Sequence, residues 1–198
     1  MYKKRSLLLC LLFVIPLFLV AGCSEYGKVD QGRVVKFDKD KKAVTLIQDM
    51  KADPQNPDYS HLPAVTYALP TNPNETGAEP KAGLRMKLDT KNRQVVIYDP
   101  ATRSFKNIDY TLIDEKDNVA KTDELVKDKK FPIVDREKKT ITIYSGRQKI
   151  LVTFSLPEEY FALPDYTWDS GDEVRIYYKE DGKALRFMNI SKTDIYKK

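Results

Sequence analysis

The feature that most constrains the fold is a β-rich pattern that occurs twice, in the same order, along the chain. Each copy holds a charged turn with a strand-forming run, an aromatic–Ala–Leu–Pro motif, a strand that begins with glycine, and a Phe-x-Asn-Ile segment. The matched segments are 37–47 with 134–144, 67–70 with 161–164, 83–88 with 171–178, and 105–108 with 187–190. Because the four matches keep one order, we interpret them as an internal duplication; the alternative is a generic similarity among the hairpins of one sheet.

The local patterns within each copy are typical of antiparallel strands. β-branched and aromatic residues, which strands favour, are dense at 44–47 and 141–144. Asp181-Gly182 supplies the residues of a tight hairpin turn between two further strand-like runs. No stretch keeps a 3.6-residue apolar period over three turns, and the best helical candidate, 157–163, allows only one or two turns. The chain is therefore predicted to be all-β.

Proline-rich loops and a charged linker divide the predicted strands into two tandem modules. We expect a first module over 28–113, a charged linker over 114–125 and a second module over 126–198. Each module is expected to be a small antiparallel β-barrel of the five-stranded OB-like type, because closing a sheet into a barrel removes the exposed edges of its strands.

An aromatic cluster surrounds the second Ala-Leu-Pro motif. Tyr160, Tyr166 and Trp168 stand within nine residues of one another and are candidate ligand-binding aromatics, which could stack on a sugar ring or a peptide. The interpretation that we favour is structural: each Ala-Leu-Pro motif plugs one end of its barrel, and the later aromatics staple the loop over it. The residues predicted to be buried as plugs are Tyr67 and Leu69 in the first module and Phe161 and Leu163 in the second.

The N-terminus has the layout of a bacterial lipoprotein signal peptide. Three basic residues at 3–5 precede an apolar run at 7–21, which is shorter than the roughly 20 residues that a spanning helix needs. Val20-Ala21-Gly22-Cys23 then resembles a lipobox, in which the cysteine thiol receives diacylglycerol before cleavage. We expect residues 1–22 to be removed, Cys23 to be lipidated and 23–27 to form a tether; the alternative is a plain signal anchor.

The remaining composition excludes some classes of protein. The chain has 34 Lys and Arg against 29 Asp and Glu, and three of the basic residues belong to the leader, so the body is nearly neutral and no nucleic-acid partner is expected. The two cysteines are Cys10, in the leader, and Cys23. No disulfide is therefore expected, and the core alone must stabilise the mature fold.

The sequence also resembles a known family. The lipobox, Gly32–Asp38, the paired Ala-Leu-Pro motifs and Gly171–Tyr178 are similar to a family of bacterial lipoproteins with no assigned function. The resemblance covers essentially the whole mature chain. It implies no activity, no cofactor and no site residues.

Candidate catalytic and metal-binding residues are sparse. His61 is the single histidine, so any Ser-His-Asp mechanism must use it, and it lies in a proline-flanked loop. A carboxylate-based cell-envelope hydrolase is one alternative function. A periplasmic copper carrier is another, because Met, His and Trp are soft ligands that suit Cu(I). The residues of these types are Met50, His61, Met86, Trp168 and Met188, and they are scattered along the sequence.

Together these observations favour a non-catalytic binding or accessory module that is anchored in the cell envelope by lipid on Cys23. We expect neither a cofactor nor a resident metal. Its partners are expected to be the membrane, through the lipid, and an envelope protein or glycan. Because Ser24 carries no negative charge, we expect the periplasmic face of the outer membrane if the envelope has two membranes.

Overall fold

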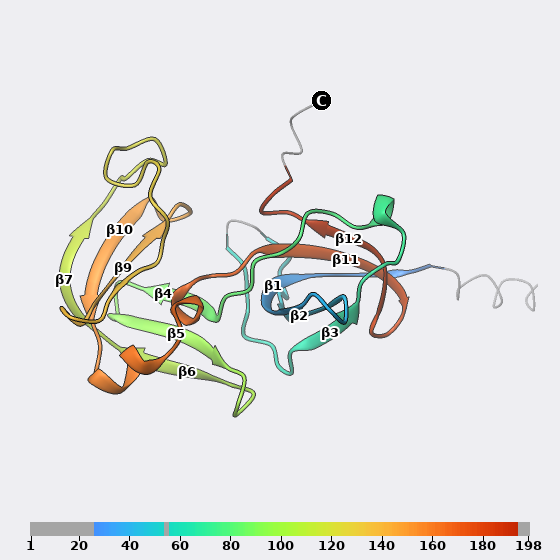
Figure 1. The fold of residues 1–198 in the computed structure, drawn as a ribbon, viewed down its shortest axis with the longest axis horizontal. Helices are drawn as coiled ribbons and strands as arrows, with labels where there is room; N and C mark the ends of the chain where they lie inside the picture. Colours follow the sequence, from blue (N-terminus) through green and yellow to red (C-terminus); the bar gives the residue numbers. More distant parts are fainter. Residues whose placement is uncertain (1–25, 54–55, 194–198) are drawn as a thin grey trace, which may run out of the picture.

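The computed structural model describes residues 26–53 and 56–193, and it confirms the all-β class for this part of the chain (Figure 1). Five strands form a closed barrel: β1 (Lys28–Asp38), β2 (Ala43–Gln48), β3 (Val65–Ala68), β11 (Glu173–Glu180) and β12 (Lys183–Asn189). Seven form a second domain between β3 and β11: β4 (Arg85–Asp89), β5 (Gln94–Asp99), β6 (Ser104–Asp109), β7 (Thr111–Lys116), β8 (Ile133–Asp135), β9 (Thr140–Ser145) and β10 (Ile150–Ser155). The described 3-10 turns are η2 (Pro73–Glu75), η3 (Glu158–Ala162) and η4 (Asp165–Trp168).

The barrel has the strand order β1-β11-β12-β3-β2, and β2 pairs with β1 to close the ring. All of its pairings are antiparallel except that of β3 with β12, which is parallel. This is the strand order of an OB-type barrel, in which the first three strands form a meander and a later hairpin closes it. The buried residues of the barrel core are Val34, Val44, Leu46, Tyr67, Val174, Ile176, Tyr178, Ala184 and Phe187.

The second domain consists of two sheets, β7-β10-β9-β8 and β4-β5-β6, which share one core. The expected second closed barrel is therefore absent from the described residues. β8 is only three residues long, and β7 pairs with the edge of β10 where an OB-type barrel would place its fifth strand. The buried residues of this core are Leu88, Val95, Ile97, Ile108, Tyr110, Ile141, Ile143, Val152, Phe154, Leu156, Phe161 and Trp168.

The strand pairing does not follow the tandem boundaries expected at 28–113 and 126–198. The hairpin β11–β12, expected in the second module, completes the barrel of β1–β3, and Figure 1 shows these red strands beside the blue and teal ones. Conversely, β4–β6, expected in the first module, pack against β9 and β10. Apolar alternation determines which face of a strand is buried, but it does not determine which strand becomes its neighbour.

The two connections that carry the hairpins from one domain to the other meet at Gly83 and Gly171. Gly83 N donates to Val34 O at 3.0 Å, and Val34 N donates to Asp172 O at 2.9 Å. Gly171 has a φ of +64°, and a Cβ there would lie 2.8 Å from Gly83 N. Only glycine fits this close backbone approach without a shift of a neighbouring strand.

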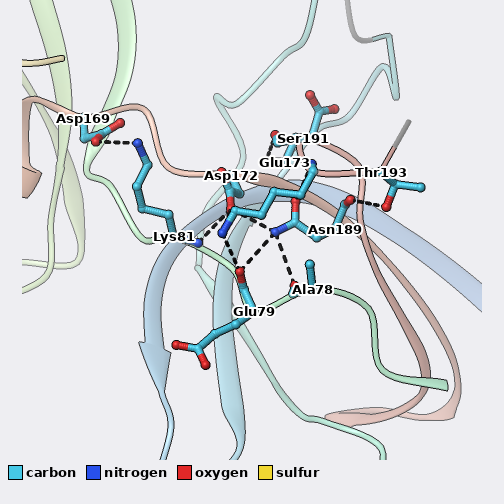
Figure 2. A network of polar contacts seen from close by, with 10 residues as sticks. Ala78, Glu79, Lys81, Asp169, Asp172, Glu173, Asn189, Ser191 and Thr193 are labelled. Carbon is cyan, nitrogen blue, oxygen red and sulfur yellow. Dashed lines mark hydrogen bonds and ion pairs between the residues drawn. The ribbon is translucent and has the colours of Figure 1, made fainter. Parts of the chain in front are cut away.

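A buried polar network holds the C-terminal segment against the first connection (Figure 2). Asp172, which is 7% exposed, accepts hydrogen bonds from Lys81 N at 2.8 Å and from Asn189 Nδ2 at 2.9 Å. Lys192 Nζ lies 3.4 Å from the same carboxylate and donates to Glu79 O at 2.7 Å. The buried carboxylate of Asp172 therefore has both charged and neutral partners, and we interpret this network as one that stabilises the fold.

An apolar cluster joins the two domains. Its buried members come from the outer face of the barrel and from the β4–β5 part of the second domain: Val35, Ile47, Tyr59, Leu84, Met86 and Tyr98. We call this set the bridging cluster. Leu84 N also donates to Tyr166 O at 3.2 Å, which continues the contact toward η4. The domains are therefore joined by packed side chains as well as by the connections.

The two charged turns that the sequence pattern matched, at 38–42 and 135–139, have the same local structure. Asp38 Oδ1 accepts a hydrogen bond from Lys41 N at 3.0 Å, and Asp135 Oδ1 accepts one from Lys138 N at 2.9 Å. In both turns the next lysine has a positive φ. Each turn joins the first two strands of a three-stranded meander, β1–β3 or β8–β10.

The Ala-Leu-Pro motifs pack against the domain of their own meander. Phe161 is 7% exposed in the core of the second domain, and Tyr67 is 2% exposed in the barrel. Leu69 and Leu163 are half-buried, and each packs against the same core as its aromatic neighbour. The predicted burial is thus confirmed for the two aromatic residues, whereas the two leucines are only half-buried.

Candidate functional site

A cleft of about 920 Å³ lies between the two domains. The barrel side contributes β1 and the loop at 56–60, and the second domain contributes β4 and the β9–β10 turn at 144–148. The segment at 170–173, which contains the second crossing connection, lies between these walls. Because both domains form the cleft, the bridging cluster that joins them also sets its width.

Two buried arginines line this cleft. Arg33 is 7% exposed, and its Nη1 donates to the carbonyls of Arg85 at 3.2 Å and of Met86 at 2.9 Å. Arg85 is 9% exposed, and its Nε donates to Trp168 O at 2.9 Å. Within residues 26–53 and 56–193, neither guanidinium has a carboxylate within ion-pair distance.

Some polar atoms beside Arg33 have no hydrogen-bond partner in the described part of the chain. They are Arg33 Nε and Tyr59 Oη, both fully shielded by protein. The Tyr59 ring lies 4.2 Å from the guanidinium carbon of Arg33, as in a cation–π contact. Buried polar groups are usually satisfied, so unsatisfied donors next to a cleft indicate a functional site.

The arginines perturb one another electrostatically. Burial, together with the positive charges of Arg33 and Arg147, lowers the pKa of the Arg85 guanidinium to about 10, and Asp169 opposes the shift. Burial also lowers the pKa of Arg33, and Arg147 contributes in the same direction. Burial raises the pKa of Tyr59, so this hydroxyl stays protonated at neutral pH. Perturbed groups gathered in one cleft are typical of functional sites.

The cleft is positively charged as a whole. Its basic residues are Arg33, Lys51, Arg85, Lys87 and Arg147, and its acidic residues are Asp58 and Glu173. Both carboxylates have neutral partners: Glu173 accepts from Gln31 Nε2 at 2.6 Å, and Asp58 accepts from Ser60 Oγ at 2.6 Å. The cleft therefore offers positive charge and hydrogen-bond donors to a ligand.

The aromatics that the sequence singled out lie outside this cleft. Trp168 is completely buried in the core of the second domain, so it has no surface on which a ligand could stack. Tyr160 is half-buried against the same core, with Lys106 Nζ 5.0 Å from its ring centroid. Tyr166 is 48% exposed. The structure thus gives the three residues different environments and places only Tyr166 on the surface.

The candidate copper ligands are also dispersed. Met86 lies in the bridging cluster and Trp168 in the core of the second domain, whereas Met50, His61 and Met188 are exposed. Within the described ranges, no group of three or more His, Cys, Asp or Glu side chains is arranged to hold a metal ion.

Sequence reasoning missed Arg33 and Arg85, although the pattern contained a signal. Each arginine has uncharged residues directly before and after it in the sequence, as Gly32-Arg33-Val34 and Leu84-Arg85-Met86 show. A charge within a β-rich run, where exposed and buried positions alternate, can be buried only with partners or a function.

The predicted signal peptide and Cys23 fall outside the described residues, and so does most of the tether at 23–27. Among the residues that the structure describes, no helix is long and apolar enough to cross a membrane.

A family model described as "Domain of unknown function (DUF4881)" matches residues 25–198. No curated protein and no solved structure matches the chain significantly.

Proposed function

The chain belongs to the DUF4881 family, and we propose that it is a non-catalytic binding module, anchored in the bacterial cell envelope by lipid on Cys23, with its ligand site in the interdomain cleft. The observation that carries this proposal is the pair of buried arginines without carboxylate partners on the walls of the cleft. Burial of an unpaired charge is costly, so such residues are retained for binding more readily than for stability.

The anchoring part of the proposal rests on the sequence. The basic start, the apolar run at 7–21 and the lipobox ending at Cys23 support export and lipidation. Two acyl chains bury enough methylene groups for stable membrane attachment. Replacement of Cys23 by Ser is expected to release the protein into the soluble fraction, and retention of that variant in the membrane would contradict the anchor.

We also infer that the chain is a duplicated unit whose closing hairpins are exchanged. The equivalent charged turns, the two Ala-Leu-Pro motifs and the meeting of Gly83 with Gly171 support this inference. In such a unit, the hairpin β4–β5 is the counterpart of β11–β12, and each joins the meander of the other half. The exchange explains why the cleft has walls from both halves.

Photo-crosslinking in envelope membranes tests the binding site. A photoreactive phenylalanine derivative would replace Lys51 or Asn107, exposed residues on opposite walls of the cleft. Matched controls at Tyr166 and Leu185 are 48% and 47% exposed and lie outside it. We expect adducts from the cleft positions and few from the controls. Adducts from Tyr166 alone would restore the aromatic cluster as the binding surface and contradict the cleft.

A further inference from the structure

We propose that the interdomain cleft binds an oxyanion, a phosphate or carboxylate group of its ligand, through the guanidinium groups of Arg33 and Arg85. This inference rests on the proposed function, because it names the chemistry of the ligand for the same cleft. Three observations support it: the free donors of the two arginines, the charge balance around them, and the other groups that line the cleft.

Backbone carbonyls orient both arginine side chains in the cleft. Arg33 Nη1 is held by two backbone carbonyls, and Arg85 Nε is held by Trp168 O, so both side chains are fixed in place. Arg33 Nε has no acceptor in the described residues. Guanidinium donors form a planar fork that matches two oxygen atoms of a carboxylate or a phosphate. The protein thus fixes Arg33 through Nη1 and Arg85 through Nε, and a ligand in the cleft would meet the other nitrogen atoms of the two guanidinium groups.

The charge balance also favours an anion. Two buried like charges near one another destabilise the free protein, and an anion between them would offset both their repulsion and their lost hydration. Glu173 attracts Arg33 and so offsets this only in part, because it lies outside ion-pair distance and accepts from Gln31, while Asp58 accepts from Ser60. Exposed Lys51 and Arg147, on opposite walls, extend the positive potential to the mouth of the cleft and would attract an anion toward it.

The remaining lining limits what kind of anion can bind. The cleft, at about 920 Å³, is in the size range of sites for small molecules or one end of a larger one. Phe105 and Tyr144 line it beside the basic residues, so apolar or ring surface next to the anionic group would find contacts. Tyr59, whose ring lies against the Arg33 guanidinium, is a further member of the lining. A nucleic acid fits poorly, because the body as a whole is nearly neutral.

Calorimetric titration of the full chain in a neutral detergent tests the proposal. Pyrophosphate and citrate are the two probes, one for phosphate and one for carboxylate, and sodium chloride at equal ionic strength is the background. We expect wild-type protein to bind at least one probe with 1:1 stoichiometry. At ten times the Kd, that probe should raise the Tm by roughly 3–6 °C. The probe that binds more tightly identifies the source of the oxyanion.

Three variants assign the binding to the arginines. Arg33→Gln and Arg85→Gln should each weaken binding at least about tenfold, because each removes one charged fork. Arg147→Gln serves as a test if a variant of a buried arginine fails to fold, because Arg147 is exposed. Loss of the Arg147 charge should weaken binding by a smaller factor and should reduce the salt dependence of binding. The matched control is Arg186→Gln, since Arg186 is already paired with Glu75 at 2.5 Å outside the cleft. Its affinity should stay within about twofold of wild type.

The outcomes separate this inference from the proposed function. If neither probe binds at millimolar concentration, or if Arg33→Gln, Arg85→Gln and Arg147→Gln all bind as wild type, the oxyanion site is wrong. Crosslinks from Lys51 and Asn107 would then still support a cleft ligand, but an uncharged one. If the crosslinks also fail at the cleft, the proposed function fails with it.

Discussion

Replacement of Gly171 by Ala should reveal how tightly the two connections are packed where they meet. Gly171 has a φ of +64° and Gly182, in the β11–β12 turn, has a φ of +79°, so either alanine variant suffers the same left-handed backbone penalty. That penalty is about 1–2 kcal/mol. The two sites differ in space: the nearest atom to a Cβ at Gly182 is Thr66 O at 3.6 Å, an ordinary contact. Gly182→Ala is therefore the matched control.

At Gly171 the added methyl group would overlap backbone atoms that cannot rotate away. It would lie 2.8 Å from Gly83 N and even closer to Val34 O, and these two atoms are hydrogen-bonded to each other. Overpacking of this kind costs about 1–3 kcal/mol. A weakened hydrogen bond adds about 1 kcal/mol. We therefore expect Gly171→Ala to lower the free energy of unfolding by about 3–6 kcal/mol, against about 1–2 kcal/mol for Gly182→Ala.

Urea unfolding followed by far-UV circular dichroism measures both losses. The midpoints give the difference directly if the slopes of the two transitions agree. Equal losses for the two variants, within about 0.5 kcal/mol, would mean that the close approach of the connections is not as the structure has it.

Three further results are expected. Trp168→Ala should lower the free energy of unfolding by about 3–5 kcal/mol, whereas Leu163→Ala, at a half-buried position, should cost about 2 kcal/mol or less; urea unfolding of both variants would contradict this ranking if Leu163→Ala were the more damaging. Hydrogen bonds from Lys87 and the Asn92 amide lower the pKa of Asp89 to about 2, so this carboxylate stabilises the fold at pH values above its ordinary pKa and loses that effect as the pH falls toward 2. Asp89→Asn should thus be less stable than wild type at pH 7, with the gap in Tm closing between about pH 4 and pH 2; a gap that does not change with pH would refute this origin. Phe187→Ala, in the barrel core, should shift the unfolding transition seen by the fluorescence of Trp168, the single tryptophan, because the bridging cluster couples the domains; an unchanged fluorescence transition would show that the second domain unfolds independently.

The local structure of this protein was largely predictable from its sequence. The charged turn after Phe37, the hairpin turn at Asp181-Gly182 and the burial of Phe161 all follow from short-range rules of turn chemistry and alternation. The strand partners were not predictable in the same way. Nothing in the sequence near Val174 distinguishes pairing with β1 from pairing within its own half, because both neighbours would bury the same face.

The candidate site was missed for a related physical reason. Arg33 and Arg85 stand 52 positions apart, and they meet only because the hairpin after Gly83 crosses to the other domain. A sequence pattern can mark each as a charge in an apolar setting, but only the strand pairing shows that both face one cleft. The complete burial of Trp168 agrees with the structural interpretation of this aromatic, which its sequence alone did not separate from a ligand-binding surface.

Nuclear magnetic resonance of the arginine Nε–H groups would test the central claim most directly, because each Nε signal reports on the surroundings of its own guanidinium group. In ¹⁵N-labelled protein titrated with the tighter of pyrophosphate and citrate, the Nε signals of Arg33 and Arg85 should shift together and saturate at one equivalent. The Nε signal of Arg186, which already donates to Glu75, should stay in place. Shifts confined to exposed arginines such as Arg103, with Arg33 and Arg85 unmoved, would contradict the assignment of the cleft as an oxyanion site.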